Sequence, residues 1–465
     1  MRSAVIKNYH ALASTGDVRV RGPVLAIAEA ALVALDTYRV LHSMLTVDGD
    51  NLRIGSRSWP LGGSRRVFVL GAGKAGNAMA RAVDEVLGDR IHAGLVSVKR
   101  LEAGDRLKHL DLIEGGHPLP DEASLQASRR ILAMTDQVAP GDLVITLISG
   151  GSSALMCCPL PDITLSDERA VTESLLTSGA RILEINAVRR HISAINGGRL
   201  AERIERRGAE LINLIVSDSV GKKPVYDPSE PTEFVGTPVA PDGTTLADAR
   251  AVIGRYGLTD RIPQSIARFL KDAGPEQETP KVFGANVHHF VLERPGNACE
   301  AARAAAEEMG VHALVLTTQL EGESRDAGTF LACIAKEVAL NHRPIAQPAI
   351  LIAGGETTTR VDSAAGRGGP SQELALSFAL EVADRPGMSI VALDTDGTDG
   401  PTDVAGGVAD GCTVERVRAL GQNVHDVLCR HDSGSLLERL GDTIVTGNTG
   451  TNVCDLNLIY VAAQA

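Results

Sequence analysis

The sequence predicts an α/β protein of two domains, the first built on a parallel sheet and the second a smaller α/β domain. Its 465 residues, 44% of them hydrophobic, exceed what one core usually holds. Short apolar runs typical of buried strands alternate with helical patterns, the order that βαβ units and a parallel sheet require. A stretch rich in charge and proline, Lys271–Pro280, interrupts the alternation. We therefore expect domains at residues 1–278 and 279–465.

The first half contains a βαβ unit followed by further strands and helices. An amphipathic helix at Pro23–Leu45 is expected to pack on the first domain. Asp121 is a candidate cap for the helix that follows it. The other expected elements are an extended segment at Asn51–Leu61, strands at Arg66–Leu70, His92–Val98, Asp142–Ile148 and Leu211–Val216, and helices at Ala75–Leu87, Leu125–Met134 and Ile185–Leu200.

The second half resumes this alternation after an irregular region. Lys222–Thr245 is rich in Pro, Gly, Asp and Thr, which predicts a long functional or mobile loop. The elements expected after it are helices at Ala298–Met309 and Ala327–Leu340, and strands at His312–Thr317, Ala349–Ala353 and Ser389–Leu393.

A glycine-rich turn with one lysine follows the first buried strand. Gly71, Gly73 and Gly76 have the spacing of a dinucleotide-binding turn. An NAD site needs an acid about 20 residues further on, but the next strand ends in Lys99-Arg100, which only NADP would tolerate. Lys74 suits a phosphoryl group or carboxylate, bound beside the N–H groups of a helix N-terminus. The residues favour phosphate or carboxylate binding over dinucleotide binding or a merely tight turn.

A second glycine-rich turn follows the strand that ends at Ile148. It approximates the turn that carries the nucleophile of serine hydrolases, with Ser152 at the bend. A hydrolase also needs a histidine near the C-terminus, and the last one, His431, has no distinctive context. We therefore favour a second oxyanion-binding loop over a hydrolase site. Its residues are Ser149, Gly150, Gly151, Ser152 and Ser153.

Other positions supply further polar and cationic groups. Asn186, Arg189 and Ser193 are three and four residues apart, which places them on one helical face. Arg367 lies between glycines with no adjacent acid, and such a guanidinium normally binds an external anion. Because ligands bind at the carboxyl ends of strands in open parallel sheets, we expect the loops of both domains to face one cleft.

Three aspartates lie in a glycine-rich loop of the second half. Asp394, Asp396 and Asp399 follow a predicted strand. Such a loop can hold Mg²⁺ through one or two carboxylates while phosphate oxygens and water complete the octahedron. The alternative is that Asp and Gly simply form turns. Three carboxylates among glycines favour the metal site.

Composition excludes several classes of function. The formal net charge of −12 argues against a nucleic-acid-binding surface, which needs clustered Lys and Arg. The 7 cysteines are scattered without zinc-type pairs, which fits reduced thiols in the cytosol. No signal-like segment opens the chain, and no apolar run approaches the ~20 residues that span a bilayer. We expect a soluble, cytoplasmic protein without nucleic-acid or membrane partners.

The chain resembles the class II glycerate 2-kinases almost from end to end. Their C-terminal part is called the MOFRL domain. The motifs that carry the resemblance are Gly71 to Gly76, Gly115-Gly116-His117-Pro118, Ser149 to Ser153, Asn186 with Arg189, Gly197-Gly198-Arg199-Leu200, Ser217-Asp218, Pro241-Asp242, Leu320-Glu321-Gly322-Glu323, Gly354-Gly355-Glu356-Thr357, Gly366 to Gly369 with Gln372-Glu373, Thr398-Asp399-Gly400 and Thr449-Gly450-Thr451-Asn452-Val453.

The resemblance implies ATP-dependent phosphorylation of D-glycerate at its 2-hydroxyl, with Mg²⁺. The fold it implies is a Rossmann-like N-terminal domain and a smaller MOFRL domain, with the active site in the cleft between them. Lys74 and Arg367 match the catalytic lysine and arginine of the family. We expect Asp218 to accept the proton, and Gly368 and Asn452 to join the substrate- and phosphate-binding residues.

The chain departs from the family pattern in several loops. The departures are Lys222, Gly236-Thr237-Pro238-Val239, Pro370-Ser371 and Asn448. They leave open which hydroxy acid is preferred. Because relatives have carried the name hydroxypyruvate reductase, an NADPH-dependent reductase is the alternative. The sequence also leaves open the nucleotide and whether the protein forms a homodimer.

Overall fold

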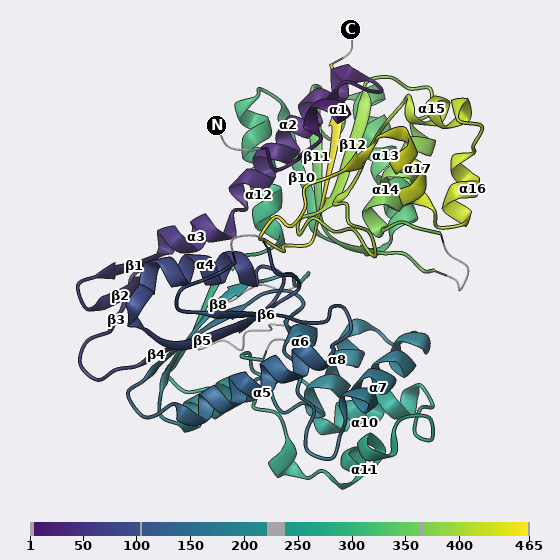
Figure 1. The fold of residues 1–465 in the computed structure, drawn as a ribbon. Coiled ribbons are helices and arrows are strands. Elements are labelled where there is room, and N and C mark those ends of the chain that lie inside the picture. The colour runs from purple at the N-terminus through teal and green to yellow at the C-terminus, as the bar shows by residue number, and fades with distance from the viewer. Residues whose placement is uncertain (1–3, 103–104, 221–237, 362–365, 464–465) are drawn as a thin grey trace. The chain divides into compact units, whose positions relative to one another are not determined.

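The computed structural model describes residues 4–102, 105–220, 238–361 and 366–463. They form two compact units, which we describe separately (Figure 1). Unit 1 comprises Met1–Asp36, Asp218–Gly221 and Glu293–Ala465, and unit 2 comprises Thr37–Ser217 and Lys222–Leu292. Each unit is therefore built from separate stretches of the chain, and the N-terminal stretch belongs to the same unit as the C-terminal one. The sequence analysis instead places a single boundary between residues 278 and 279.

A six-stranded sheet forms the centre of unit 2, with strand order β6-β5-β4-β7-β8-β9. Parallel pairing joins β6 through β8, with Leu70 of β4 opposite Leu95 of β5 and Thr146 of β7. This confirms the predicted parallel sheet. The strands are β4 (Val67–Ala72), β5 (Ile91–Val98), β6 (Asp111–Glu114), β7 (Leu143–Ile148), β8 (Glu210–Val216) and β9 (Val287–Glu293).

Helices cover both faces of this sheet, with α4 on one face and α5 on the other (Figure 1). Every residue of β4 and β7 is buried, as expected for strands covered on two sides. The helices are α3 (Thr37–Met44), α4 (Gly76–Leu87), α5 (Glu122–Gln137), α6 (Ser152–Leu155), α7 (Leu165–Thr177), α8 (Ile182–His191), α9 (Arg199–Arg206), α10 (Leu246–Arg255) and α11 (Gln264–Asp272). Asp121 caps α5 as predicted, accepting from Ser124 N at 2.8 Å.

The helix expected at Ile185–Leu200 is wrong. Helix α8 ends at His191, and α9 begins only at Arg199. Asn186 and Arg189 share α8, but Ser193 lies beyond its end. The segment Asn51–Leu61 contains two short antiparallel strands, β2 (Asn51–Ile54) and β3 (Arg57–Pro60), and β2 also pairs antiparallel with β1 (Leu45–Asp48).

Unit 1 contains a mixed sheet with strand order β10-β11-β15-β12-β13-β14. Only β10 and β11 pair in parallel, and the other pairs within this sheet are antiparallel. The rule that places ligands at the carboxyl ends of parallel strands therefore does not extend to this unit's loops. The strands are β10 (His312–Glu323), β11 (Ala349–Thr358), β12 (Met388–Asp394), β13 (Gly406–Asp410), β14 (Thr443–Ile444) and β15 (Asp455–Val461).

Helices α2 and α12 cover one face of this sheet, and α13 and α14 cover the other (Figure 1). The bounds are α1 (Tyr9–Ala13), α2 (Val18–Ala34), α12 (Pro295–Glu308), α13 (Ser324–Asn341), α14 (Pro370–Glu381), α15 (Thr413–Ala419), α16 (Val424–Cys429) and α17 (Ser433–Leu440). The single helix predicted at Pro23–Leu45 is wrong, because α2 belongs to unit 1 and α3 to unit 2.

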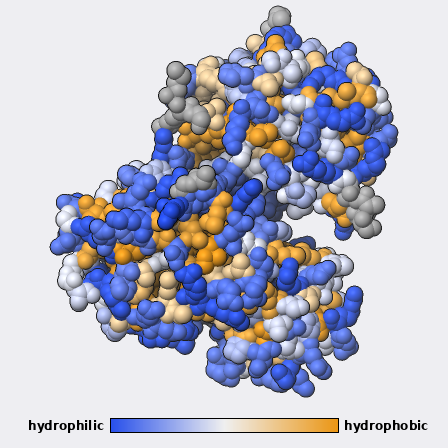
Figure 2. Space-filling model, viewed as in Figure 1, coloured by the Kyte–Doolittle hydropathy of each residue, from blue (hydrophilic) through white to orange (hydrophobic). Residues whose placement is uncertain are grey.

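The polar surface and the free cysteines agree with what the composition of the chain predicts. Polar and charged side chains cover most of the face shown in Figure 2. All seven cysteines carry free thiols. No helix among the described residues is long and apolar enough to cross a bilayer.

Candidate active site

The two glycine-rich turns of unit 2 pack directly on each other. They follow the neighbouring strands β4 and β7, so both lie at the carboxyl ends of parallel strands. Lys74 N donates to Gly150 O at 2.9 Å, and Ala75 N donates to Ser149 Oγ at 3.0 Å. Gly73 has a φ of +145°, and a Cβ there would lie 2.0 Å from Ser149 Oγ. Close approach of the turns therefore requires glycine at position 73.

His117 lies against these turns, on the loop that follows β6. A Cβ added to Gly151 would lie 2.9 Å from the His117 ring and 3.4 Å from Lys74 Cγ. Lys74, Gly151 and His117 are thus neighbours. The sequence analysis quoted His117 only within a family motif and assigned it no role at the site.

Arg189 reaches the second turn from α8. Its Nη1 and Nη2 donate to Ser153 Oγ at 3.4 Å and Ser153 O at 3.2 Å. Its Nε lies 3.8 Å from Glu168, a buried carboxylate of α7 that also accepts from Cys157 Sγ at 2.9 Å. Burial raises the pKa of Glu168, and Arg189 opposes that rise. The sequence analysis did not predict Glu168 as a site residue.

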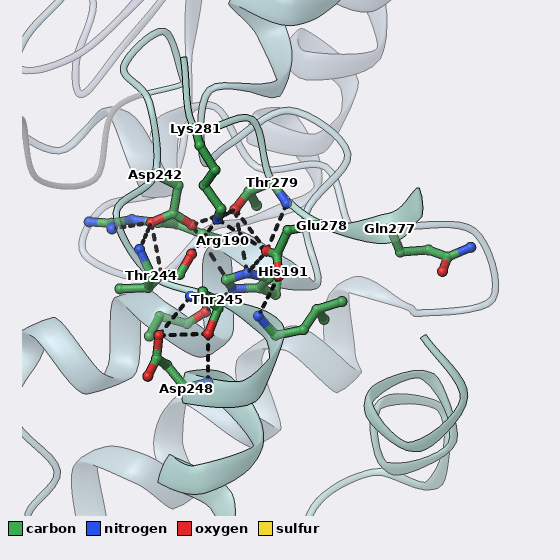
Figure 3. Close-up of polar contacts among 12 residues, drawn as sticks. Arg190, His191, Asp242, Thr244, Thr245, Asp248, Gln277, Glu278, Thr279 and Lys281 are labelled. Atoms are coloured by element: carbon green, nitrogen blue, oxygen red, sulfur yellow. Dashed lines mark hydrogen bonds and ion pairs between the residues drawn. The ribbon is translucent and has the colours of Figure 1, made fainter. Parts of the chain in front are cut away.

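The C-terminal end of α8 is anchored by a buried polar cluster (Figure 3). Arg190 donates to Asp242 at 2.8 Å, and His191 Nε2 lies 2.6 Å from Glu278 Oε1. Burial opposes ionisation of Glu278, but hydrogen bonds from Leu246 N, His191, Thr279 N and Lys281 lower its pKa to about 2. The cluster fixes the helix that carries Asn186 and Arg189.

Asp218, the predicted proton acceptor, belongs to unit 1 rather than to the unit that holds the neighbouring strand β8. Asn452 Nδ2 donates to Asp218 Oδ2 at 3.0 Å, and Cys454 Sγ donates to Asp218 O at 2.8 Å. Burial raises the pKa of Cys454, and the nearby carboxylates of Asp218, Glu356, Asp455 and Asp394 raise it further. Two of the predicted residues, Asp218 and Asn452, are therefore in direct contact within an acidic environment.

The three predicted metal ligands differ in their surroundings. Asp399 is fully buried and accepts from Ser371 N at 3.0 Å and from Gln372 N at 2.9 Å, which caps helix α14. Burial raises its pKa to about 6. Asp394 accepts from Asp396 N at 3.0 Å, and Asp396 Oδ1 accepts from Thr398 N of the same loop at 2.8 Å. Among the residues that the structure describes, no group of three or more His, Cys, Asp or Glu side chains could hold a metal ion.

Arg367 has no acid beside it in the sequence, but it is paired with one that is distant in the chain. Its Nη1 donates to Glu438 Oε2 at 2.9 Å. The acid lies 71 residues away in sequence, on α17, where no local pattern could indicate it. Gly368 follows, and a Cβ there would lie 2.2 Å from Ser433 Oγ.

The predicted residues thus form two groups. Unit 2 brings together Lys74, Gly71, Gly73, the Ser149–Ser153 turn and Arg189, with Asn186 on the same helix. Unit 1 holds Asp218, Asn452, the three aspartates, Arg367 and Gly368. Gly71 is a packing position, since a Cβ there would lie 2.5 Å from Leu147 O.

Some of the positions that depart from the family pattern lie among the described residues. Lys222, Gly236 and Thr237 lie outside the described residues, as does most of the predicted loop Lys222–Thr245. Pro370 and Ser371 begin α14, where proline is favoured because the first helical N–H has no intrahelical partner. Asn448 Oδ1 accepts from Gly450 N at 3.1 Å.

The fold and these loops define a two-unit α/β protein in which two glycine-rich turns contact each other at the ends of parallel strands. Family models agree: residues 23–271 match a domain of unknown function, DUF4147, and residues 349–455 match the MOFRL family. The chain is 38% identical over 450 residues to the glycerate 2-kinase of Pyrococcus horikoshii, covering 96% of this chain and 98% of that one. It belongs to the class II glycerate 2-kinase family.

Two Thermotoga maritima comparisons agree with this assignment. The D-glycerate 2-kinase of that organism is 39% identical over 392 residues, covering 84% of this chain and 89% of the relative. A crystal structure of glycerate kinase from Thermotoga maritima superposes with a TM-score of 0.77 at 36% identity, covering 94% of this chain and 98% of the other.

Proposed function

We propose that the protein transfers the γ-phosphoryl group of ATP to the 2-hydroxyl of D-glycerate, giving 2-phosphoglycerate and ADP. One observation carries the proposal: Lys74 lies in a turn that packs on the Ser149–Ser153 turn, beside Arg189, at the ends of parallel strands. The arrangement offers two cations, serine hydroxyls and backbone N–H groups to an anion. Relatives named glycerate 2-kinase support the choice of reaction.

The reaction is an in-line displacement at phosphorus. The 2-hydroxyl oxygen forms a bond to the γ-phosphorus as the bond to the β,γ-bridging oxygen breaks, and the hydroxyl proton passes to Asp218. Asn452 orients the Asp218 carboxylate through its amide. Lys74 and Arg367 stabilise negative charge on the phosphoryl group or the substrate carboxylate. The Ser149–Ser153 turn, Asn186 and Arg189 bind the acid or phosphate groups.

Mg²⁺ fits the chemistry of the aspartate loop, because this ion prefers oxygen ligands and usually takes one or two protein carboxylates. Asp394 and Asp396 are the better candidates. Asp399 is the weaker one, since both its oxygens accept hydrogen bonds at the start of α14. When bound, the ion would neutralise phosphate charge.

An assay of two activities tests the function directly. ADP release with D-glycerate and ATP is measured beside NADPH oxidation with hydroxypyruvate. We expect the first activity, and NADPH oxidation without ADP release would instead establish the reductase. A panel of related 2-hydroxy acids then identifies the preferred substrate, which the departures at Pro370-Ser371 and Asn448 leave open.

Replacing Lys74 or Arg367 by Ala is expected to lower kcat by about 10²-fold or more, the usual effect of losing one transition-state donor. Lys108, an exposed lysine of unit 2, supplies the control, and Lys108→Ala should turn over at the wild-type rate. Wild-type turnover in the Lys74 or Arg367 variant would remove that residue from the catalytic machinery.

The cellular setting follows from composition. Seven free thiols support a reducing compartment such as the cytoplasm. A small hydroxy acid and a nucleotide are the partners that the function requires, and size-exclusion chromatography with light scattering would establish whether the enzyme is a homodimer.

A further inference from the structure

The segment that carries Arg367 is fixed by the turn between α16 and α17. Gly366 N donates to Arg430 O at 2.7 Å, Arg367 N donates to Asp432 Oδ1 at 3.1 Å, and Gly434 N donates to Arg367 O at 2.8 Å. Both backbone groups of Arg367 therefore bind this turn.

Glycines on both sides of Arg367 let its segment lie directly on the turn. A Cβ on Gly366 would lie 2.5 Å from Asp432 Cβ, and a Cβ on Gly368 would lie 2.2 Å from Ser433 Oγ. Because glycine restricts the backbone least, the direction of the Arg367 side chain depends on where the turn lies.

His431 connects this turn to two helices beneath it. Its Nδ1 lies 2.7 Å from Arg325 Nη2 and 2.9 Å from Glu373 Oε1. Since a guanidinium only donates, Nδ1 accepts from Arg325 and has no proton to donate to Glu373, so Arg325 is the group that links His431 to Glu373. Arg325, on α13, also donates to Glu373 Oε2 at 2.7 Å and to Leu428 O at the end of α16. Glu373 is buried on α14.

The cluster of His431, Glu373 and Arg325 therefore ties the turn to both helices that cover this face of the sheet. His431 itself has a φ of +53°, which is uncommon for residues other than glycine, although Asn, Asp and His adopt it more often than the rest. A histidine at such a position adds backbone strain, and its side-chain contacts offset that strain.

We propose that His431, held by Arg325, which is itself paired with Glu373, is a positioning residue that sets the location of Arg367 for phosphoryl transfer. The inference rests on the proposed function only through the role of Arg367. It gives a function to the one histidine that the sequence analysis found without distinctive context.

The variant that tests the proposal is His431→Gly. Glycine accepts the left-handed conformation, so the substitution removes the imidazole without adding backbone strain. We expect kcat to fall by about 10-fold, because small misplacement of a charge-stabilising group is costly, with little change in Tm. His431→Asn, which tolerates the same φ and keeps an acceptor, should recover part of the loss.

A double-mutant cycle with Arg367→Ala separates positioning from general damage. If His431 acts through Arg367, His431→Gly lowers kcat in the wild-type background but not in the Arg367→Ala background. Equal losses in both backgrounds, or none in either, would overturn the proposal. His425→Ala is the matched control, because His425 is exposed on the neighbouring helix α16.

Hydrogen exchange provides a readout that needs no activity. The amides of Gly366 and Arg367 donate to the turn, so they should exchange at least several-fold faster in His431→Gly, while those of β15 are unchanged. Unchanged exchange at Gly366 and Arg367 overturns the positioning role whatever the substrate. Absence of ADP release by the wild type with faster exchange in the variant would overturn only the proposed function.

Discussion

Arg367 forms an ion pair with a carboxylate, and both side chains are exposed to solvent. The side chains of Arg367 and Glu438 are 51% and 64% exposed. An exposed ion pair of this kind contributes only about 0–1 kcal/mol and is screened by salt. A phosphate or carboxylate ligand can therefore displace Glu438 from Arg367 at small cost, and the pair lowers the affinity for such ligands by a similarly small amount.

Under the role proposed for Arg367, Glu438→Gln is expected to lower KM for the anionic substrate by about two- to fivefold, the range that an exposed pair allows. The effect should diminish as salt is added, and Tm should stay at its wild-type value. Steady-state kinetics at low and high ionic strength measure KM and its dependence on salt, and thermal unfolding measures Tm.

Asp426→Asn is the control for the change in net charge, since Asp426 is exposed on α16. A similar decrease of KM in Asp426→Asn would show that overall charge, rather than competition for Arg367, is responsible.

At the residue scale, sequence reasoning succeeded where residues are neighbours through the sheet. The turns at Lys74 and Ser149 follow strands that pair in parallel, so the order of strands brings them together. Glu438 and Glu168 could not be found in this way. Each glutamate lies on a helix and its arginine lies on a different element, and a helical pattern predicts which face is buried but not which side chain contacts a distant one.

Helix α8 shows what fixes an element as a whole. Its last two residues, Arg190 and His191, bind Asp242 and Glu278, which precede α10 and follow α11. Glu278 Oε2 also accepts from Leu246 N at 2.9 Å, the first residue of α10. One carboxylate therefore joins the end of one helix to the start of another, as Figure 3 shows.

Glu278 should make stability depend on pH in the acid range. Its folded pKa of about 2 lies below the ordinary value of 4.5, so the unfolded chain binds more protons between these values. The stabilisation is fully present above about pH 4.5 and is lost as pH falls toward 2. A shift of this size corresponds to about 3 kcal/mol at most.

The matching variant is Glu278→Gln, which keeps the shape and removes the charge. Urea unfolding at pH 7 should give a free energy about 1–3 kcal/mol below wild type. The difference should shrink as the pH is lowered from 5 to 3. Glu276→Gln is the control, since Glu276 is exposed in the same segment. A constant difference between variant and wild type across this range would contradict the assignment.

At the element scale, the helix after Arg181 illustrates the limit of periodicity. The pattern over Ile185–Leu200 is helical, but the chain leaves the helix at Ile192. Ser193 Oγ accepts from Ile195 N and Asn196 N, and Asn196 donates to Met156 O. Polar side chains that bind the backbone compete with helical hydrogen bonds, and such bonds to a distant loop are not visible in a local pattern.

The division of the molecule into two units does not follow the order of the chain. Residues 1–36 belong to the unit formed mainly by the C-terminal part, although they precede every strand of the first sheet. Composition indicated two α/β regions, because it reports how much core the chain can form. It could not indicate that an N-terminal helix packs on a distant part, since nothing local distinguishes the two partners.

One contact between this helix and the rest of unit 1 is made by a buried arginine. Arg21 of α2 is fully buried. It donates to Asp410 at the end of β13, and its Nη1 and Nη2 donate to Asp442 before β14 at 2.7 and 3.0 Å. Arg416 also binds Asp442 at 2.6 Å. Removing one partner of such a network leaves uncompensated buried charge, which is more costly than the pair is stabilising.

Arg21→Ala is therefore expected to destabilise unit 1 by about 3–5 kcal/mol, because Asp410 stays buried without its cation. Arg19→Ala is the matched control on the same helix: Arg19 is 63% exposed and pairs with Asp17, so its loss should change the stability little. Urea unfolding of the full chain, followed by limited proteolysis, measures the difference and shows which unit opens first. Arg21→Ala should expose cleavage sites between Glu293 and Ala465 at urea concentrations where Arg19→Ala remains intact. Equal stability of the two variants would mean that the apolar face of α2, rather than its buried charge, holds the N-terminal helix on the C-terminal unit.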